Sequence, residues 1–340
     1  MKRSWIGILA IGWAFVLSLP ASAADAQPKT VSIGTHPMGS MFNIIGTAAA
    51  TVVAKNTTIM PTVKPMAGPV AWYPLLPTAE IDLGVVNNWD AEKGYLGQST
   101  YQRLSEGKGF PLRLVAVTIP NSISLVVSAN SGITKITELK GKRVAGSFPT
   151  PSLQAQTEAI LANGGLSFAD VKIIPVDSPP SGIKAVTEGR ADASGTATIG
   201  MPVIEELHAR NGARFLPLDA SAEPVRRTNA KYPGYPVKVT PGPGKTGVDQ
   251  EMHLWAYDIY LVSRAGLPDD AVYQITKALW ENYKEFAPIH PLLKEWTPER
   301  FVSKEARIPY HPGGVKFYRE KGAWTSEMEK LQRELLAQRQ

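Results

Sequence analysis

Short apolar segments alternate with amphipathic segments along most of the chain, and this alternation limits the fold more than any other feature. Thr30–Gly34 reads as a strand and is followed by a helical pattern from Ser40, with apolar residues at i, i+3 and i+4. Val171–Val176 reads as a strand before a helix over Ser181–Glu188. Strand–helix repetition predicts open, mainly parallel sheets with helices on both faces. We therefore predict an α/β protein, and 340 residues favour two domains over one core.

The two domains are predicted to interleave in the sequence. Two apolar strands, Ile123–Ser128 and Trp255–Ser263, would carry the chain out of the first block and back again, as a two-strand hinge. Lobe I is then 25–122 plus 264–340. Lobe II is 123–263, including the hinge strands and a Pro/Gly-rich insertion at 224–248 that we interpret as loop. Two sequential domains are the alternative.

The first 24 residues have the layout of a secretory signal peptide. Lys2 and Arg3 precede an apolar stretch from Trp5 to Leu19, and small residues surround Ala23 and Ala24. An apolar run this short favours a signal over a membrane span, which needs roughly 20 residues. We expect cleavage near Ala23 or Ala24 and export of the remaining chain. An uncleaved N-terminal anchor is the alternative.

Composition removes several function classes. The chain has no cysteine, which rules out disulfides, thiolate metal sites and cysteine nucleophiles. A hydrophobic fraction of 44% is typical of a folded globular protein. The net charge of +6 is small and no basic run is present, so we expect no nucleic-acid partner.

Enzyme and cofactor motifs are missing from the sequence. It has no Gly-x-Ser-x-Gly elbow, phosphate-binding loop, His-Glu-x-x-His or dinucleotide fingerprint. The five histidines are isolated, so we expect neither a metal nor a cofactor. We interpret the protein as a non-enzyme. The alternative is an enzyme that uses Asp90 or Asp258 as a base.

Three polar turns at the starts of helices are the best candidates for a ligand site. They cover residues 34–42, 146–153 and 194–200, and each places glycines and hydroxyls before a helix. Helix N-termini favour anions without Lys or Arg, and ligands of open α/β sheets sit beyond the carboxyl ends of strands. Ordinary N-capping is the alternative for each turn. A fourth candidate wall, 87–89, offers amides and an indole. The candidate ligand-binding residues are Thr35, His36, Gly39, Ser40, Met41, Phe42, Asn87, Asn88, Trp89, Ser147, Thr150, Ser152, Leu153, Thr196 and Thr198.

Several stretches together resemble one known family. They are Ile33–Gly46, Glu80–Asn87, Glu138–Ala145, Gly189–Ala193, Leu267–Leu279 and Tyr310–Tyr318 with Gly322–Trp324. The Leu267–Leu279 and Tyr310–Trp324 stretches are the most specific. The chain resembles the TAXI-type solute receptors of TRAP (tripartite ATP-independent periplasmic) transporters over nearly all of its length after the signal.

The resemblance implies a type II periplasmic-binding-protein-like fold, with two lobes of mixed, mainly parallel sheets joined by a two-strand hinge. It implies a periplasmic monomer that captures a small, carboxylate-containing organic solute and delivers it to membrane-embedded TRAP permease subunits. The candidate turns carry bulkier residues than the glycine-rich turns of the family, which would reshape the cleft. Alternatives on the same fold are an ABC-type receptor and a ligand-binding adaptor of a sensor kinase.

Overall fold

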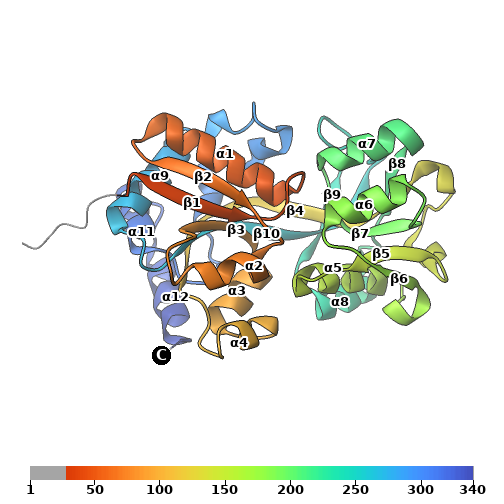
Figure 1. Cartoon of the computed structure of the whole chain (residues 1–340), viewed down its shortest axis with the longest axis horizontal. Helices are drawn as coiled ribbons and strands as arrows, with labels where there is room; N and C mark the ends of the chain where they lie inside the picture. Colours follow the sequence, from red (N-terminus) through yellow and green to blue (C-terminus); the bar gives the residue numbers. More distant parts are fainter. Residues whose placement is uncertain (1–27, 340) are drawn as a thin grey trace, which may run out of the picture.

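The computed structural model describes residues 28–339, and one mixed sheet runs through that part of the molecule (Figure 1). Its strands follow the order β2-β1-β3-β10-β4-β7-β5-β6, with β8 on β4 and β9 on β10. The strands are β1 (Thr30–Thr35), β2 (Met60–Pro65), β3 (Leu83–Asn87), β4 (Leu112–Ser128), β5 (Arg143–Ser147), β6 (Lys172–Pro175), β7 (Ala193–Thr198), β8 (Ala213–Phe215), β9 (Tyr235–Val239) and β10 (Met252–Arg264).

Helices cover the sheet at both ends of the molecule. They are α1 (Met41–Asn56), α2 (Pro69–Trp72), α3 (Asn88–Leu96), α4 (Thr100–Leu104), α5 (Pro151–Asn163), α6 (Pro179–Thr187), α7 (Pro202–Asn211), α8 (Ala222–Lys231), α9 (Asp269–Glu281), α10 (Pro298–Phe301), α11 (Pro312–Glu320) and α12 (Ser326–Ala337). None of the helices between residues 28 and 339 combines the length and apolar character that crossing a bilayer requires.

The structure has two lobes (Figure 1). One holds β1–β3 with α1–α4, α9, α11 and α12; the other holds β5–β8 with α5–α8. Parallel pairs β1–β2, β1–β3, β5–β6 and β5–β7 lie inside the lobes. The long strands β4 and β10 pair antiparallel and run between the lobes. The predicted α/β class, with mixed sheets in two lobes, is confirmed.

Two local predictions were wrong, both at prolines. Ile123–Ser128 is not a separate strand but the second part of β4. The strand continues through Pro120, which lies beside a register shift in the pairing with β10, where a missing N–H is tolerated. The 224–248 segment is not loop throughout, since α8 and β9 occupy part of it. Pro224 sits in the first turn of α8, whose N–H groups have no intrahelical partner, and β9 is an edge strand.

Close packing in the first lobe depends on glycines beneath an indole. Gly34 of β1 and Gly84 of β3 lie opposite each other in register, and the fully buried Trp72 packs over both. A Cβ on Gly84 would lie 2.2 Å from Cη2 of Trp72. The bare backbone at these positions lets α2 approach the sheet that positions the loops of the site.

We predict that Gly84→Ala destabilises the protein by about 1–3 kcal/mol, the usual cost of overpacking a filled core. The change in the free energy of unfolding is measured by urea denaturation. Gly242→Ala is the matched control, because nothing lies within 4 Å of its added Cβ, and it should stay within about 0.5 kcal/mol of the wild type. Equal stability of the two variants would contradict the packing described here.

Candidate ligand-binding site

A small chamber lies between the two lobes; we call it the inner chamber. The loop before α1 and the start of α1 form one wall, α5 and the segment around β7 form the other, and Tyr257 of β10 closes it. Its lining is His36, Ser40, Met41, Phe42, Leu153, Gln156, Pro179, Thr196, Thr198, Met201 and Tyr257. About 270 Å³ of this space is free of atoms, but it is too narrow for more than a single small molecule. That is room for about one water molecule, so the lobes are closed on each other.

Four polar side-chain atoms in the lining of the inner chamber have no hydrogen-bond partner. Nε2 of His36, Oγ1 of Thr196 and both amide atoms of Gln156 are buried and unpaired. Gln156 lies beside the hydroxyls of Tyr232 and Tyr257, but neither amide atom completes a hydrogen bond of ordinary geometry. Because buried polar groups are nearly always paired, such a cluster marks a place where a solute can supply the partners.

Thr196 has an unusual backbone conformation. Its φ is +50°, in the left-handed region that a β-branched residue rarely adopts. Strain of this kind is found where the surrounding structure holds a side chain in place for a function. Here it accompanies a hydroxyl that lies without a partner in the wall of the inner chamber.

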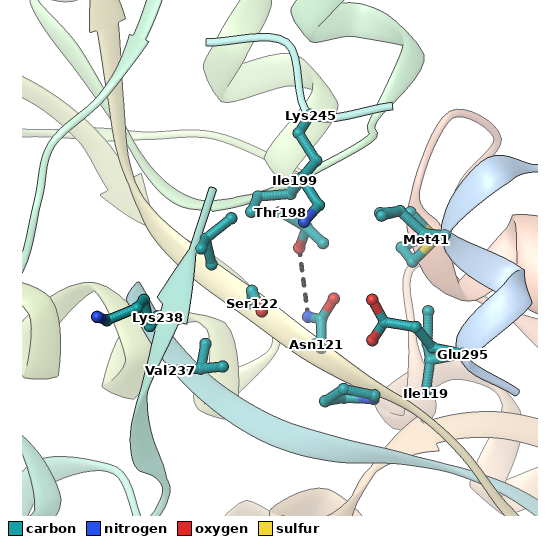
Figure 2. Close-up of a pocket in the computed structure, with 13 residues that line it drawn as sticks. Met41, Ile119, Asn121, Ser122, Thr198, Ile199, Val237, Lys238, Lys245 and Glu295 are labelled. Atoms are coloured by element: carbon teal, nitrogen blue, oxygen red, sulfur yellow. Dashed lines mark hydrogen bonds between the residues drawn. The ribbon is translucent and has the colours of Figure 1, made fainter. Parts of the chain in front are cut away.

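A second space, the outer chamber, adjoins the inner one and shares Met41 and Thr198 with it. It holds about 520 Å³ free of atoms, beside the β4 segment 119–122 that crosses between the lobes. In Figure 2, Lys245 and Glu295 point into this space while Lys238 points away. Asn121 sits on its floor, and its Nδ2 donates to Oγ1 of Thr198 at 3.3 Å while its Oδ1 has no partner.

A buried carboxylate joins the lobes next to the inner chamber. Oδ1 of Asp90, on α3, accepts from the Tyr101 hydroxyl at 2.8 Å, and Oδ2 accepts from Nδ2 of Asn87 at 2.7 Å. The Ser152 hydroxyl, on α5 of the other lobe, also donates to Oδ2. Burial raises the pKa of Asp90 to about 6, against the lowering effect of the donors from Ser152, Tyr101 and Asn87.

The structure gathers some of the residues proposed from sequence and separates others. The inner chamber brings together His36, Ser40, Met41, Phe42, Leu153, Thr196 and Thr198. Asn87 and Ser152 instead bind Asp90. Thr35 bonds locally, donating to the His36 carbonyl, and the Thr150 hydroxyl donates to the Ala67 carbonyl at 3.1 Å rather than capping α5. Trp89 stacks on Tyr232. Gly39, Asn88 and Ser147 line neither chamber.

Sequence reasoning missed Gln156, Tyr257 and Asn121 as site residues. Gln156 had a usable signal: it follows Leu153 by three positions and Ser152 by four, so all three lie on one face of α5. Tyr257 and Asn121 lie on the two crossing strands, and their hydrogen bond of 2.5 Å joins β10 to β4. Only the pairing of strands far apart in the sequence brings them together.

The carboxylates considered as enzymatic bases are engaged in structural contacts. Asp258 pairs with Nη2 of Arg300 at 2.7 Å, and both oxygens of Asp90 accept hydrogen bonds. In the part of the chain that the structure describes, no group of three or more His, Asp or Glu side chains could hold a metal ion.

We predict a pH-dependent difference in stability between the wild type and Asp90→Asn. The folded-state pKa of about 6 lies above the ordinary value for Asp of about 3.9 in an unfolded chain. Folding therefore favours the protonated form, and this contribution is fully present below about pH 4 and lost as the pH rises through 6. Relative to Asp90→Asn, the wild type should lose about 3 kcal/mol between pH 4 and 7. Urea unfolding at several pH values measures it, with exposed Asp249→Asn as control. Parallel pH profiles for the wild type and Asp90→Asn would count against the buried carboxylate.

Similar proteins add to this picture. PhnD1 from Prochlorococcus marinus (MIT 9301), solved with methylphosphonate, is 12% identical, with a TM-score of 0.53 over 87% of this chain and 100% of that one. The alkanesulfonate-binding protein SsuA from Xanthomonas axonopodis pv. citri is 15% identical (TM-score 0.47; 89% and 96% covered). The periplasmic aliphatic sulphonate binding protein SsuA from Escherichia coli is also 15% identical (TM-score 0.43; 90% and 92%).

The likeness to PhnD1 shows a shared two-lobed fold, because at 12% identity it speaks for architecture alone. The sequence itself matches a family pattern, that of the NMT1-like family, over residues 33–322. This match spans most of the chain, including both lobes and both crossing strands. The chain therefore belongs to the NMT1-like family.

Proposed function

We propose that this protein is a periplasmic solute-binding receptor, which captures a small organic solute between its lobes and presents it to a membrane transporter. The observation that carries the proposal is the inner chamber, where buried polar atoms of His36, Gln156 and Thr196 from both lobes converge without partners. The similar structure of PhnD1 was solved in complex with a small solute, methylphosphonate, which favours capture over catalysis. The segment proposed as a signal peptide, 1–24, lies outside the described residues, so the proposed periplasmic location rests on the sequence.

Capture requires the lobes to open, because the inner chamber has room for about one water molecule. We propose that 25–122 with 264–340 moves as one body and 123–263 as the other, with the hinge in the crossing strands near 119–124 and 256–259. Three contacts would form on closure: Ser152 with Asp90, Thr150 with the Ala67 carbonyl, and Nε2 of His290 with the Gly200 carbonyl at 2.9 Å. A solute held between the lobes stabilises the closed form by mass action.

The transporter that receives the solute belongs to one of a few classes. The sequence stretches quoted above resemble receptors of TRAP permeases, but the family match over residues 33–322 is to the NMT1-like family and not to the TAXI receptors specifically. The ABC-type alternative therefore fits the comparisons better than the TRAP permease does. Affinity capture from membranes with the receptor as bait separates them. An ATPase subunit among the captured proteins supports an ABC importer, two membrane subunits with uptake driven by an ion gradient support TRAP, and a histidine kinase supports sensing.

We predict that a bound solute depends on Gln156. Solute released by denaturing the purified protein is quantified by mass spectrometry, and a thermal-shift screen of small solutes follows. Gln156→Leu removes one partner of a buried hydrogen bond, which weakens binding by about 1–3 kcal/mol, or roughly 5- to 150-fold. Gln154→Leu is the matched control: it lies on the same helix, outside both chambers, and bonds to Glu158. A wild-type protein that releases no solute and responds to none would overturn the proposal.

A further inference from the structure

We infer that the solute is uncharged where it occupies the inner chamber and that it offers both hydrogen-bond donors and acceptors there, as a carboxamide does. This inference deepens the proposed function and rests on it. It departs from the carboxylate-containing solute that the sequence favoured. Four observations carry it: the neutral lining, the use of the helix starts by the chain itself, the buried charge of Asp90, and the opposed charges of the outer chamber.

The lining of the inner chamber carries no charged side chain other than a titratable histidine. Its polar members are His36, Ser40, Gln156, Thr196, Thr198 and Tyr257. Burial lowers the pKa of His36 to about 4, so its ring is neutral at pH 7. A solute carboxylate in this space would therefore find hydrogen-bond donors but no compensating positive charge, and burying an ion without one is costly.

At two of the three turns that suggested an anion site, the serine hydroxyl is already engaged. The Ser40 hydroxyl donates to the Pro37 carbonyl at 2.7 Å and accepts from the Asn43 N–H, so it caps α1. At the start of α5, the Ser152 hydroxyl donates to the carboxylate of Asp90. The first residue of α5 is Pro151, which has no N–H to offer. The Ser152 hydroxyl at that helix start is thus already used by a carboxylate of the chain itself.

The charge of Asp90 also opposes a second anion nearby. The negative charge of Asp90 is felt in the inner chamber: it contributes to raising the pKa of Tyr257, whose side chain lines that chamber. The groups that bear on Asp90 are the donors Ser152, Tyr101 and Asn87 and the tyrosines 73, 232 and 257, none of them cationic. Two carboxylates that share a site of low dielectric without a cation repel each other.

The charged side chains of the outer chamber do not make up for the lack of a cation beside the inner chamber. Lys245 and Glu295 both point into it, and Lys238 points away (Figure 2). Opposite charges on one space cancel much of each other's effect on a solute at a distance. The unpaired Oδ1 of Asn121, also on this space, is an acceptor and so favours a solute N–H or O–H over a carboxylate oxygen.

The unpaired groups match a neutral polar solute. The Gln156 amide offers a donor and an acceptor side by side, the Thr196 hydroxyl can do either, and Nε2 of neutral His36 offers one of the two. Around them, Met41, Phe42, Leu153 and Met201 form apolar walls. With the lobes far enough apart to admit it, an amide group between these apolar walls would pair with these atoms without burying a charge.

Matched pairs of amides and acids test the inference on the wild-type protein. Nicotinamide and nicotinate, benzamide and benzoate, and propionamide and propionate are compared by thermal shift and calorimetry at pH 8, where the acids are ionised. Solute released from the purified protein is identified by mass spectrometry in parallel. We expect a released solute that is neutral at pH 7, and a stabilising amide whose acid binds weaker by about tenfold or more.

A released anion, or an acid that binds as well as its amide, overturns this inference and leaves the proposed receptor function standing. A protein that releases no solute and responds to no pair contradicts the receptor function, and this inference with it. Asp90→Asn supplies an independent check, because it should narrow the preference for amide over acid. Asp82→Asn, which removes a carboxylate paired with Arg264 outside both chambers, should leave that preference unchanged.

Discussion

The antiparallel pairing of β4 with β10 is the constraint on which the rest of this structure depends. The paired residues run from Leu112 with Arg264 to Ile123 with Trp255, so two strands distant in sequence carry the chain between the lobes. In each lobe one strand joins this central pair antiparallel, β3 on β10 and β7 on β4, and parallel strands are added beyond it. Because the loops that follow these strands face the neighbouring lobe, the geometry of the two crossing strands decides which side chains meet.

The hydrogen bonds around Asp90 include one that joins the two lobes. Burying a carboxylate among hydroxyl and amide donors removes its charge from water, which costs free energy. The pKa of Asp90 is raised for that reason. The contact with Ser152 joins the two lobes, so it would break if the lobes open as proposed. Because this carboxylate already binds the Ser152 hydroxyl, that hydroxyl is not available to a solute anion. Closure and solute choice are therefore linked through one side chain.

Local chemistry explains which predictions were correct. N-capping was the alternative for the turn that holds Ser40, and the Ser40 hydroxyl does accept from the Asn43 N–H, because capping needs only neighbouring residues. The alternation of strands and helices indicated the α/β class for the same reason. The prediction of a loop over 224–248 was wrong because proline is compatible with a first helical turn and with an edge strand. Sequence composition does not distinguish these elements from a loop.

By itself, the sequence determined the fold class, the helix that starts at Met41 and seven of the eleven residues that line the inner chamber: His36, Ser40, Met41, Phe42, Leu153, Thr196 and Thr198. These residues lie in turns whose glycines and hydroxyls mark the starts of helices. Only the tertiary structure decided that Ser152 faces a carboxylate of the other lobe, and that Gln156 and Tyr257 meet in the same space. The physical reason is that hydrogen bonds between the lobes join residues more than 60 positions apart, and their partners depend on how the crossing strands set one lobe against the other.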